Sequence, residues 1–95
     1  MPKLLSIDPA VLKRLQALPK SEKTECLVAL CELHEGFGKP HLQSRLGIRK
    51  LGGTLFEFRA NSSLHYLFQN RATDLYVFFL GNHDDILALL RSKKL

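Results

Sequence analysis

Apolar residues in the N-terminal part of the chain recur at the spacing of amphipathic helices. A first stripe predicts a helix that Asp8 caps, that holds Pro9 in its first turn and that ends at Pro19. A second stripe predicts another helix, from about Ser21 to a stop at Gly36. The members of the two stripes are Val11, Leu12, Leu15 and Leu18, and then Leu27, Leu30, Cys31 and His34. The short, mostly apolar run of residues 3–8 is typical of a strand that leads into the first helix.

The spacing of apolar residues changes from helical to two after Gly52-Gly53, which predicts that strands begin there. Residues 54–60 and 64–69 alternate apolar and polar side chains, as strands with one buried face do. Residues 75–80 are apolar without alternation, which is typical of an interior strand covered on both faces. After the break at Gly81-Asn82, Asp84 or Asp85 is placed to open a last helix.

The loop between the two alternating strands decides which side chains meet. A two-residue loop would put Phe58 opposite His65 and mix the apolar and polar faces. A three-residue loop over residues 61–63 pairs Arg59 with His65 and Phe58 with Tyr66, so that each face keeps its character. We therefore predict a three-residue loop and a direct cross-strand pair of Arg59 and His65.

These elements follow the order β-α-α-β-β-β-α along a chain of 95 residues. Helices that precede a meander of antiparallel strands are typical of an α+β fold, here with two N-terminal helices packed on a small antiparallel sheet. A chain of this length fits a single domain, which we expect to span residues 1–95. Its hydrophobic fraction of 45% is enough for one core.

Lys and Arg outnumber Asp and Glu by 14 to 9, which gives a net charge of +5. No acidic residue occurs from Gly36 through Phe56, and this basic segment is the candidate for RNA binding. Its candidate residues are Lys39, Arg45, Arg49 and Lys50. Such a surface suits nucleic acid, an acidic protein or an anionic surface, and a charged face that is merely solvated is the plain alternative.

Three short segments in the C-terminal half resemble, in their order, the RelE/ParE superfamily of type II toxins. Members typically have an apolar strand ending in Glu-x-Arg, a second strand opening with Arg and apolar residues, and a third strand ending in Gly, followed by a His and a charged pair. The corresponding segments here are Leu55-Phe56-Glu57-Phe58-Arg59, Leu64-His65-Tyr66-Leu67-Phe68 and Phe78-Phe79-Leu80-Gly81-Asn82-His83-Asp84-Asp85-Ile86. The resemblance covers about the whole chain in element order and its C-terminal half in residues.

The resemblance implies a RelE-like fold and a cytoplasmic toxin that a small acidic antitoxin neutralises, in an assembly such as a heterotetramer. It also implies cleavage of messenger RNA on the ribosome. Two alternatives stay open: inhibition of DNA gyrase, as in the ParE branch, and a RelE-fold protein that has lost catalysis. Leu55 and Glu57 stand where the best-known nucleases of the family carry lysines, which favours these alternatives, whereas the pair of Arg59 and His65 favours the nuclease.

Cleavage of RNA without a metal needs a group that takes the 2′-hydroxyl proton, a donor to the leaving 5′-oxygen and cations for the phosphate. Arg59 is the position that best matches the family, and His65 replaces its usual second-strand arginine. A neighbouring cation lowers the pKa of His65 and so favours a neutral base. His83 is the third candidate catalytic residue. The alternative is that Arg59 bonds Glu57 or the exposed face of the sheet, that His65 is an ordinary surface residue and that His83 packs in a turn.

Neither a metal site nor a cofactor is expected, because the four histidines have no zinc-ligand spacing and no phosphate-loop pattern occurs. Cys26 and Cys31 are expected to be buried free thiols in a reducing compartment. No apolar run reaches the length of about 18 residues that a membrane span needs, and no signal-peptide core is present. We therefore expect a cytoplasmic protein without a membrane partner.

Overall fold

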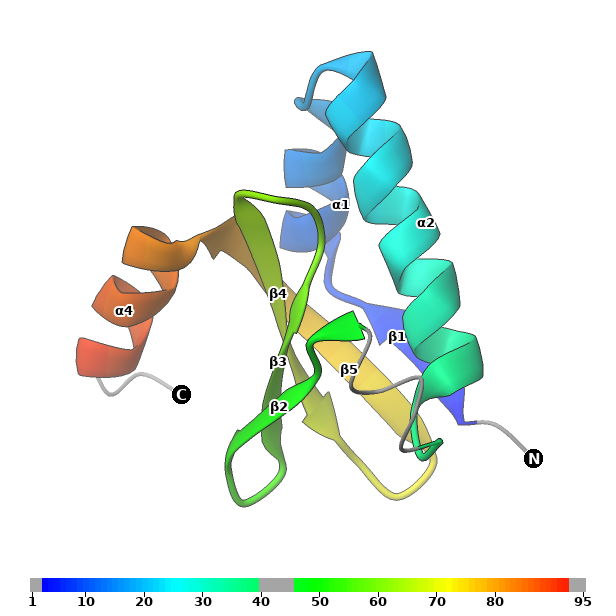
Figure 1. The fold of residues 1–95 in the computed structure, drawn as a ribbon. Helices are drawn as coiled ribbons and strands as arrows, with labels where there is room; N and C mark the ends of the chain where they lie inside the picture. The colour runs from blue at the N-terminus through cyan, green and yellow to red at the C-terminus, as the bar shows by residue number, and fades with distance from the viewer. Residues whose placement is uncertain (1–2, 40–45, 93–95) are drawn as a thin grey trace.

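The computed structural model describes residues 3–39 and 46–92 (Figure 1). In chain order, its elements are β1 (Leu4–Ile7), α1 (Pro9–Gln16), α2 (Lys20–Gly36), β2 (Arg49–Gly52), β3 (Leu55–Arg59), β4 (Leu64–Asn70), β5 (Asp74–Asn82) and α4 (His83–Arg91). The helices α1 and α2 lie side by side, and α4 follows directly after the end of β5 (Figure 1). The start of α4 approaches α1, since Nη2 of Arg14 lies 3.5 Å from Oδ2 of Asp85.

β5 lies in the interior of the sheet, as its unbroken apolar run predicts. Within the described residues the strand order is β1-β5-β4-β3-β2, and β2 to β5 are antiparallel to their neighbours. β1 instead pairs with β5 in parallel, from Leu4 opposite Asp74 to Ile7 opposite Val77. The sheet is therefore mixed rather than purely antiparallel. The helices that follow β1 provide the long connection that a parallel strand pair requires.

β2 is a strand where the sequence predicts only a loop. It pairs with β3, with Arg49 opposite Glu57 and Lys50 opposite Phe56. Only Leu51 of β2 is even half-buried, because the strand lies at the edge of the sheet. An exposed edge strand needs no alternating apolar face, so the pattern of apolar positions gave no signal for it. The observed order thus has one strand more than expected.

The two N-terminal helices form where the sequence predicts them. Asp8 caps α1, because its Oδ1 accepts a hydrogen bond from the backbone N–H of Ala10 at 2.9 Å. The buried face of α2 differs from the expected stripe, since Leu27 and Cys31 are exposed. The residues that α2 buries are Cys26, Ala29, Leu30, Leu33 and Gly36. The expectation that both cysteines are buried is therefore wrong for Cys31.

The core lies between α1, α2 and one face of the sheet. Phe58, Tyr66 and Phe68 are fully buried there, and the rings of Phe58 and Tyr66 stack with their centroids 4.8 Å apart. The Tyr66 hydroxyl donates a hydrogen bond to the backbone carbonyl of Cys26 at 2.8 Å, which satisfies its polar group inside the core. These large rings fill the layer below α2, so the helix turns small residues such as Cys26 and Ala29 toward them.

The observed architecture confirms the α+β class with two N-terminal helices packed on the sheet. Because strand residues alternate between faces, the burial of Phe58 and Tyr66 under the helices directs Glu57, Arg59 and His65 to the opposite face. In residues 3–39 and 46–92, no helix is long and apolar enough to cross a membrane. The face that carries Arg59 and His65 is where the candidate site lies.

Candidate functional site

A pocket of about 300 Å³ brings together residues from three strands and the last helix. It contains all three predicted catalytic residues: Arg59 from β3, His65 from β4 and His83 from the start of α4. The complete lining consists of Gly47, Arg49, Glu57, Arg59, His65 and His83. Charged and imidazole groups thus surround one space on the face opposite the core.

The turn between β3 and β4 determines that Arg59 and His65 stand opposite each other in the sheet. The Oδ1 atom of Asn61 accepts hydrogen bonds from the backbone N–H groups of Ser63 at 2.9 Å and Leu64 at 2.8 Å. This side-chain clamp closes the three-residue loop. Arg59 consequently stands opposite His65 in the ladder, so the predicted register is confirmed.

His83 reaches the pocket because α4 begins immediately after β5. Asn82 caps the helix, since its Oδ1 accepts from the backbone N–H of Asp85 at 2.8 Å and its own N–H donates back to the Asp85 carboxylate at 3.0 Å. The capping residue is therefore Asn82 rather than Asp84 or Asp85, although Asp85 completes the capping box. His65 is the ladder partner of Gly81, two residues before His83, and this pairing brings the two imidazoles to the same pocket.

Burial is the main influence on His65, and it lowers the pKa of the imidazole by disfavouring the charged form. The carboxylate of Glu57 acts in the opposite direction, whereas the positive charges of Arg59, His83 and Arg49 lower the pKa further. The sequence predicted the same direction from Arg59 alone and did not foresee the larger contribution of burial. The lowered pKa favours the neutral form of the His65 imidazole.

Arg59 is exposed at the rim of the site, and within the part of the chain that the structure describes its guanidinium has no hydrogen bond or ion pair. The alternative in which Arg59 bonds Glu57 is not observed. Glu57 instead accepts a hydrogen bond from Nη2 of Arg49 at 2.7 Å. Arg49 rather than Arg59 is therefore the cation that pairs with Glu57.

Among its described residues, the basic segment contributes the side chain of Arg49 to the pocket. Arg49 lines it, while Lys39 and Lys50 are exposed outside it. Arg45 lies outside the described residues. An RNA-binding role for the four residues therefore stays a prediction.

Glu57 and Gly47 also line the pocket, and sequence reasoning identified neither as a site residue. An acidic residue on the polar face of β3, next to Phe58 in the core, was the available signal for Glu57. Gly47 has a φ of 69°, a left-handed conformation that glycine adopts easily. A Cβ at this position would lie 3.8 Å from Cβ of Arg59, so the chain passes close to the site here.

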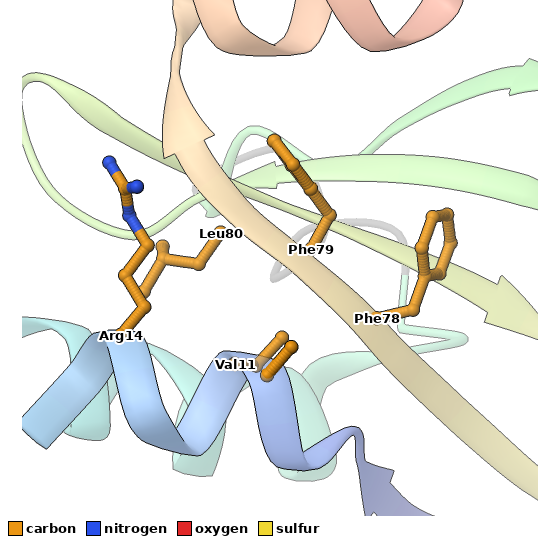
Figure 2. Close-up of a pocket in the computed structure, with 6 residues that line it drawn as sticks. Val11, Arg14, Phe78, Phe79 and Leu80 are labelled. Atoms are coloured by element: carbon orange, nitrogen blue, oxygen red, sulfur yellow. The ribbon is translucent and has the colours of Figure 1, made fainter. Parts of the chain in front are cut away.

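A second, smaller pocket of about 190 Å³ lies between α1 and β5, away from the imidazoles. Figure 2 shows Val11 pointing from α1 toward β5, with Leu80 and Arg14 at one end. The pocket is mostly apolar, and its lining residues are Ala10, Val11, Arg14, Phe78, Phe79 and Leu80. It holds no group suited to proton transfer, so it is not a candidate for the chemistry.

A metal centre is likewise not formed by the described residues, 3–39 and 46–92. Nowhere among them do three or more His, Cys, Asp or Glu side chains gather closely enough to hold an ion. In the first pocket, the lining side chains can transfer protons through imidazoles and stabilise negative charge through guanidinium groups.

No protein-family model matches the sequence, and no curated protein matches it. Solved structures of RelE proteins have a similar fold. A chain from the crystal structure of the archaeal RelE–RelB complex of Pyrococcus horikoshii aligns with a TM-score of 0.70 at 22% identity, over 86% of this chain and 96% of that chain. A mutant of the E. coli toxin RelE in the free state aligns with a TM-score of 0.68 at 19% identity, over 100% of both chains. Together with the strand order and the helix pair described above, these similarities show that the chain has a RelE-like fold.

Proposed function

We propose that this protein is the toxin of a toxin–antitoxin pair and that it cleaves messenger RNA on the ribosome. The observation that carries the proposal is the convergence of Arg59, His65 and His83 on one pocket. The similar folds of RelE proteins support the same conclusion. The half-buried imidazole of His65, whose pKa is lowered, lies beside an exposed Arg59, and the two supply the proton acceptor and the cation that the reaction needs.

In the proposed reaction, His65 takes the proton of the ribose 2′-hydroxyl while that oxygen forms a bond to the adjacent phosphorus. His83 donates a proton to the 5′-oxygen as the bond between phosphorus and this oxygen breaks. Arg59 and Arg49 stabilise the negative charge that develops on the phosphoryl oxygens. The products are a 2′,3′-cyclic phosphate and a 5′-hydroxyl, and exchange of protons with water restores both imidazoles.

The proposed partner is a small acidic antitoxin, with which the chain assembles in the cytoplasm, for example as a heterotetramer. A net charge of +5 in 95 residues favours association with an acidic chain. The similar archaeal structure is a RelE–RelB complex. Exposed apolar side chains on α1 and α2 provide surface for such a partner, namely Leu12, Leu27 and Val28.

Expression of the chain in growing cells tests the proposal directly. Without a partner it should arrest growth, and RNA from the arrested cells should have new 5′ ends inside translated frames. The adjacent reading frame should encode a small acidic protein whose coexpression restores growth. The matched control is His65→Ala, which should be produced at the same level and should leave messages intact.

A purified reaction tests the chemistry. Ribosomes loaded with a message of known sequence should yield fragments that end in a 2′,3′-cyclic phosphate. Arrest with intact messages and damaged DNA would replace this proposal by inhibition of gyrase. Absence of both growth arrest and cleavage would leave a RelE-fold protein without toxin activity.

A further inference from the structure

Glu57 is a buried acid in a pocket that otherwise gathers positive charge. Its side chain is 8% exposed, although the residue lies on the face of β3 that points away from the core. Taking a carboxylate out of water is unfavourable unless charged or hydrogen-bonding partners compensate for it. The position of Glu57 therefore calls for an account of what each carboxylate oxygen does.

The two oxygens of Glu57 face different partners on different strands. Oε1 accepts the hydrogen bond from Arg49, which stands opposite Glu57 on β2. Oε2 lies 3.7 Å from Nδ1 of His65, which comes from β4 on the other side of β3. One carboxylate thus links three neighbouring strands, and the Arg49 bond holds it in place beside the imidazole.

The geometry at the imidazole ring matters for its use as a base. Because Nδ1 faces Oε2 of Glu57, the other nitrogen, Nε2, lies on the far edge of the ring from the carboxylate. A carboxylate beside Nδ1 favours a proton on that nitrogen and leaves Nε2 as the proton acceptor. It also stabilises the imidazolium that forms when the base takes a proton. This is the physical role that a buried carboxylate plays behind a catalytic histidine in hydrolases.

We propose that Glu57 is the positioning residue of this site: held by Arg49, it orients His65 through Nδ1 and stabilises the imidazolium formed during proton transfer. The inference rests on the proposed ribonuclease function for its catalytic consequence, and on the described geometry for the coupling of Glu57 to His65. Glu57 touches neither the substrate nor the reacting atoms, and it acts only through His65.

Four groups influence the pKa of His65, and the experiment must distinguish their effects. They are Glu57 and Arg59 on β3, Arg49 on β2 and His83 on α4. Only Glu57 favours the charged imidazole, while the other three disfavour it. Removing the charge of Glu57 should therefore lower the pKa of His65, and removing Arg59 should raise it.

Nitrogen NMR of the full chain, titrated with pH, provides the test. In the unaltered protein the neutral His65 should carry its proton on Nδ1. In Glu57→Gln, which keeps the shape of the side chain, the pKa of His65 should fall. Arg59→Ala is the matched control and should shift the pKa in the opposite direction. Proton on Nε2 in the unaltered protein, or an unchanged pKa in Glu57→Gln, would overturn the proposal.

The tautomer in the unaltered chain decides the question even where Glu57→Gln fails to fold. The rate of RNA cleavage is the second measurement. Glu57→Gln should slow cleavage at least ten-fold, but by less than loss of the base itself, which reduces the rate about 10²–10⁴-fold. The acid side of its pH–rate profile should shift to lower pH, because the pKa of His65 falls. Rates and pH limbs equal to those of the parent would contradict a positioning role. If the NMR results are as expected and the parent cleaves no message, the coupling stands and the ribonuclease proposal fails.

Discussion

Arg59 on β3 stands directly opposite His65 on β4, and both side chains line the same pocket. Neither belongs to the core that α1 and α2 cover. The ladder between the strands fixes their relative position, whereas the pocket leaves the Arg59 guanidinium open to solvent. A site built in this way should allow its chemistry to be removed without loss of the fold.

Substitution of this pair should separate activity from stability. Arg59→Ala should change the free energy of unfolding by no more than about 0.5 kcal/mol, as substitution of an exposed residue usually does. His65→Ala, at a half-buried position, should lower it by about 1 kcal/mol. His65→Ala should reduce cleavage about 10²–10⁴-fold, because a general base is lost. Urea unfolding and cleavage of ribosome-bound message measure the two effects.

The double substitution provides a further check on the same pair. If Arg59 and His65 act as a unit, the double variant should lose less than the product of the two single losses. Binding to the ribosome should survive His65→Ala. Single variants that both cleave like the parent would remove this pair from the proposed site.

Gly81→Ala should disturb the start of α4 and, through it, His83. A Cβ at this position would lie 2.8 Å from Cβ of Asp85 and 2.9 Å from a ring carbon of Phe79, so the capping box must shift. We expect a loss of about 1–3 kcal/mol in the free energy of unfolding, together with reduced cleavage. Asn82→Asp is the control, since aspartate caps helices as well and adds no atom near Gly81. If Gly81→Ala has the same free energy of unfolding as the parent, the start of α4 accommodates the added Cβ without strain, and the prediction is wrong.

Salt dependence should reveal whether the basic segment binds RNA backbone. Lys39→Ala and Lys50→Ala remove exposed charges outside the pocket, so they should weaken ribosome or RNA binding without changing the cleavage step. For single-stranded RNA each lost phosphate contact should reduce the slope of log affinity against log salt by about 0.7. Lys13→Ala, on α1, is the matched control. If Lys39→Ala and Lys50→Ala have the same slope as the parent and the control, the segment does not bind RNA backbone.

Asp74 should contribute to stability in a defined range of acid pH. Hydrogen bonds, chiefly from Arg71 and then from Ser6, lower its pKa from 3.8 to about 2 in the folded chain. Its stabilisation is therefore present above pH 3.8 and is lost as the pH falls toward 2. Urea unfolding from pH 5 to pH 2 should show a decline in the free energy of unfolding, and Asp74→Asn should reduce that decline. Equal declines in the parent and in Asp74→Asn would contradict this assignment.

The sequence by itself determined the features that depend on local pattern. Alternation over residues 54–60 and 64–69, with an odd loop between them, was enough to predict that Arg59 meets His65. Asp8 before Pro9 predicted the first cap, and the apolar run of β5 predicted an interior strand. These features follow from the period of side chains and from loop parity, both of which act within a few residues.

Only the tertiary structure decided the features that depend on segments far apart in the chain. β2 exists because β3 offers its edge, and Arg49 meets Glu57 only through that pairing. The face that α2 buries depends on the rings of β3 and β4 beneath it. Burial of Glu57, and the extent to which His65 is taken out of water, likewise arise from packing that no local pattern encodes. The sequence therefore predicted that Arg59 meets His65, whereas packing set the solvent exposure and the charge environment of the pair.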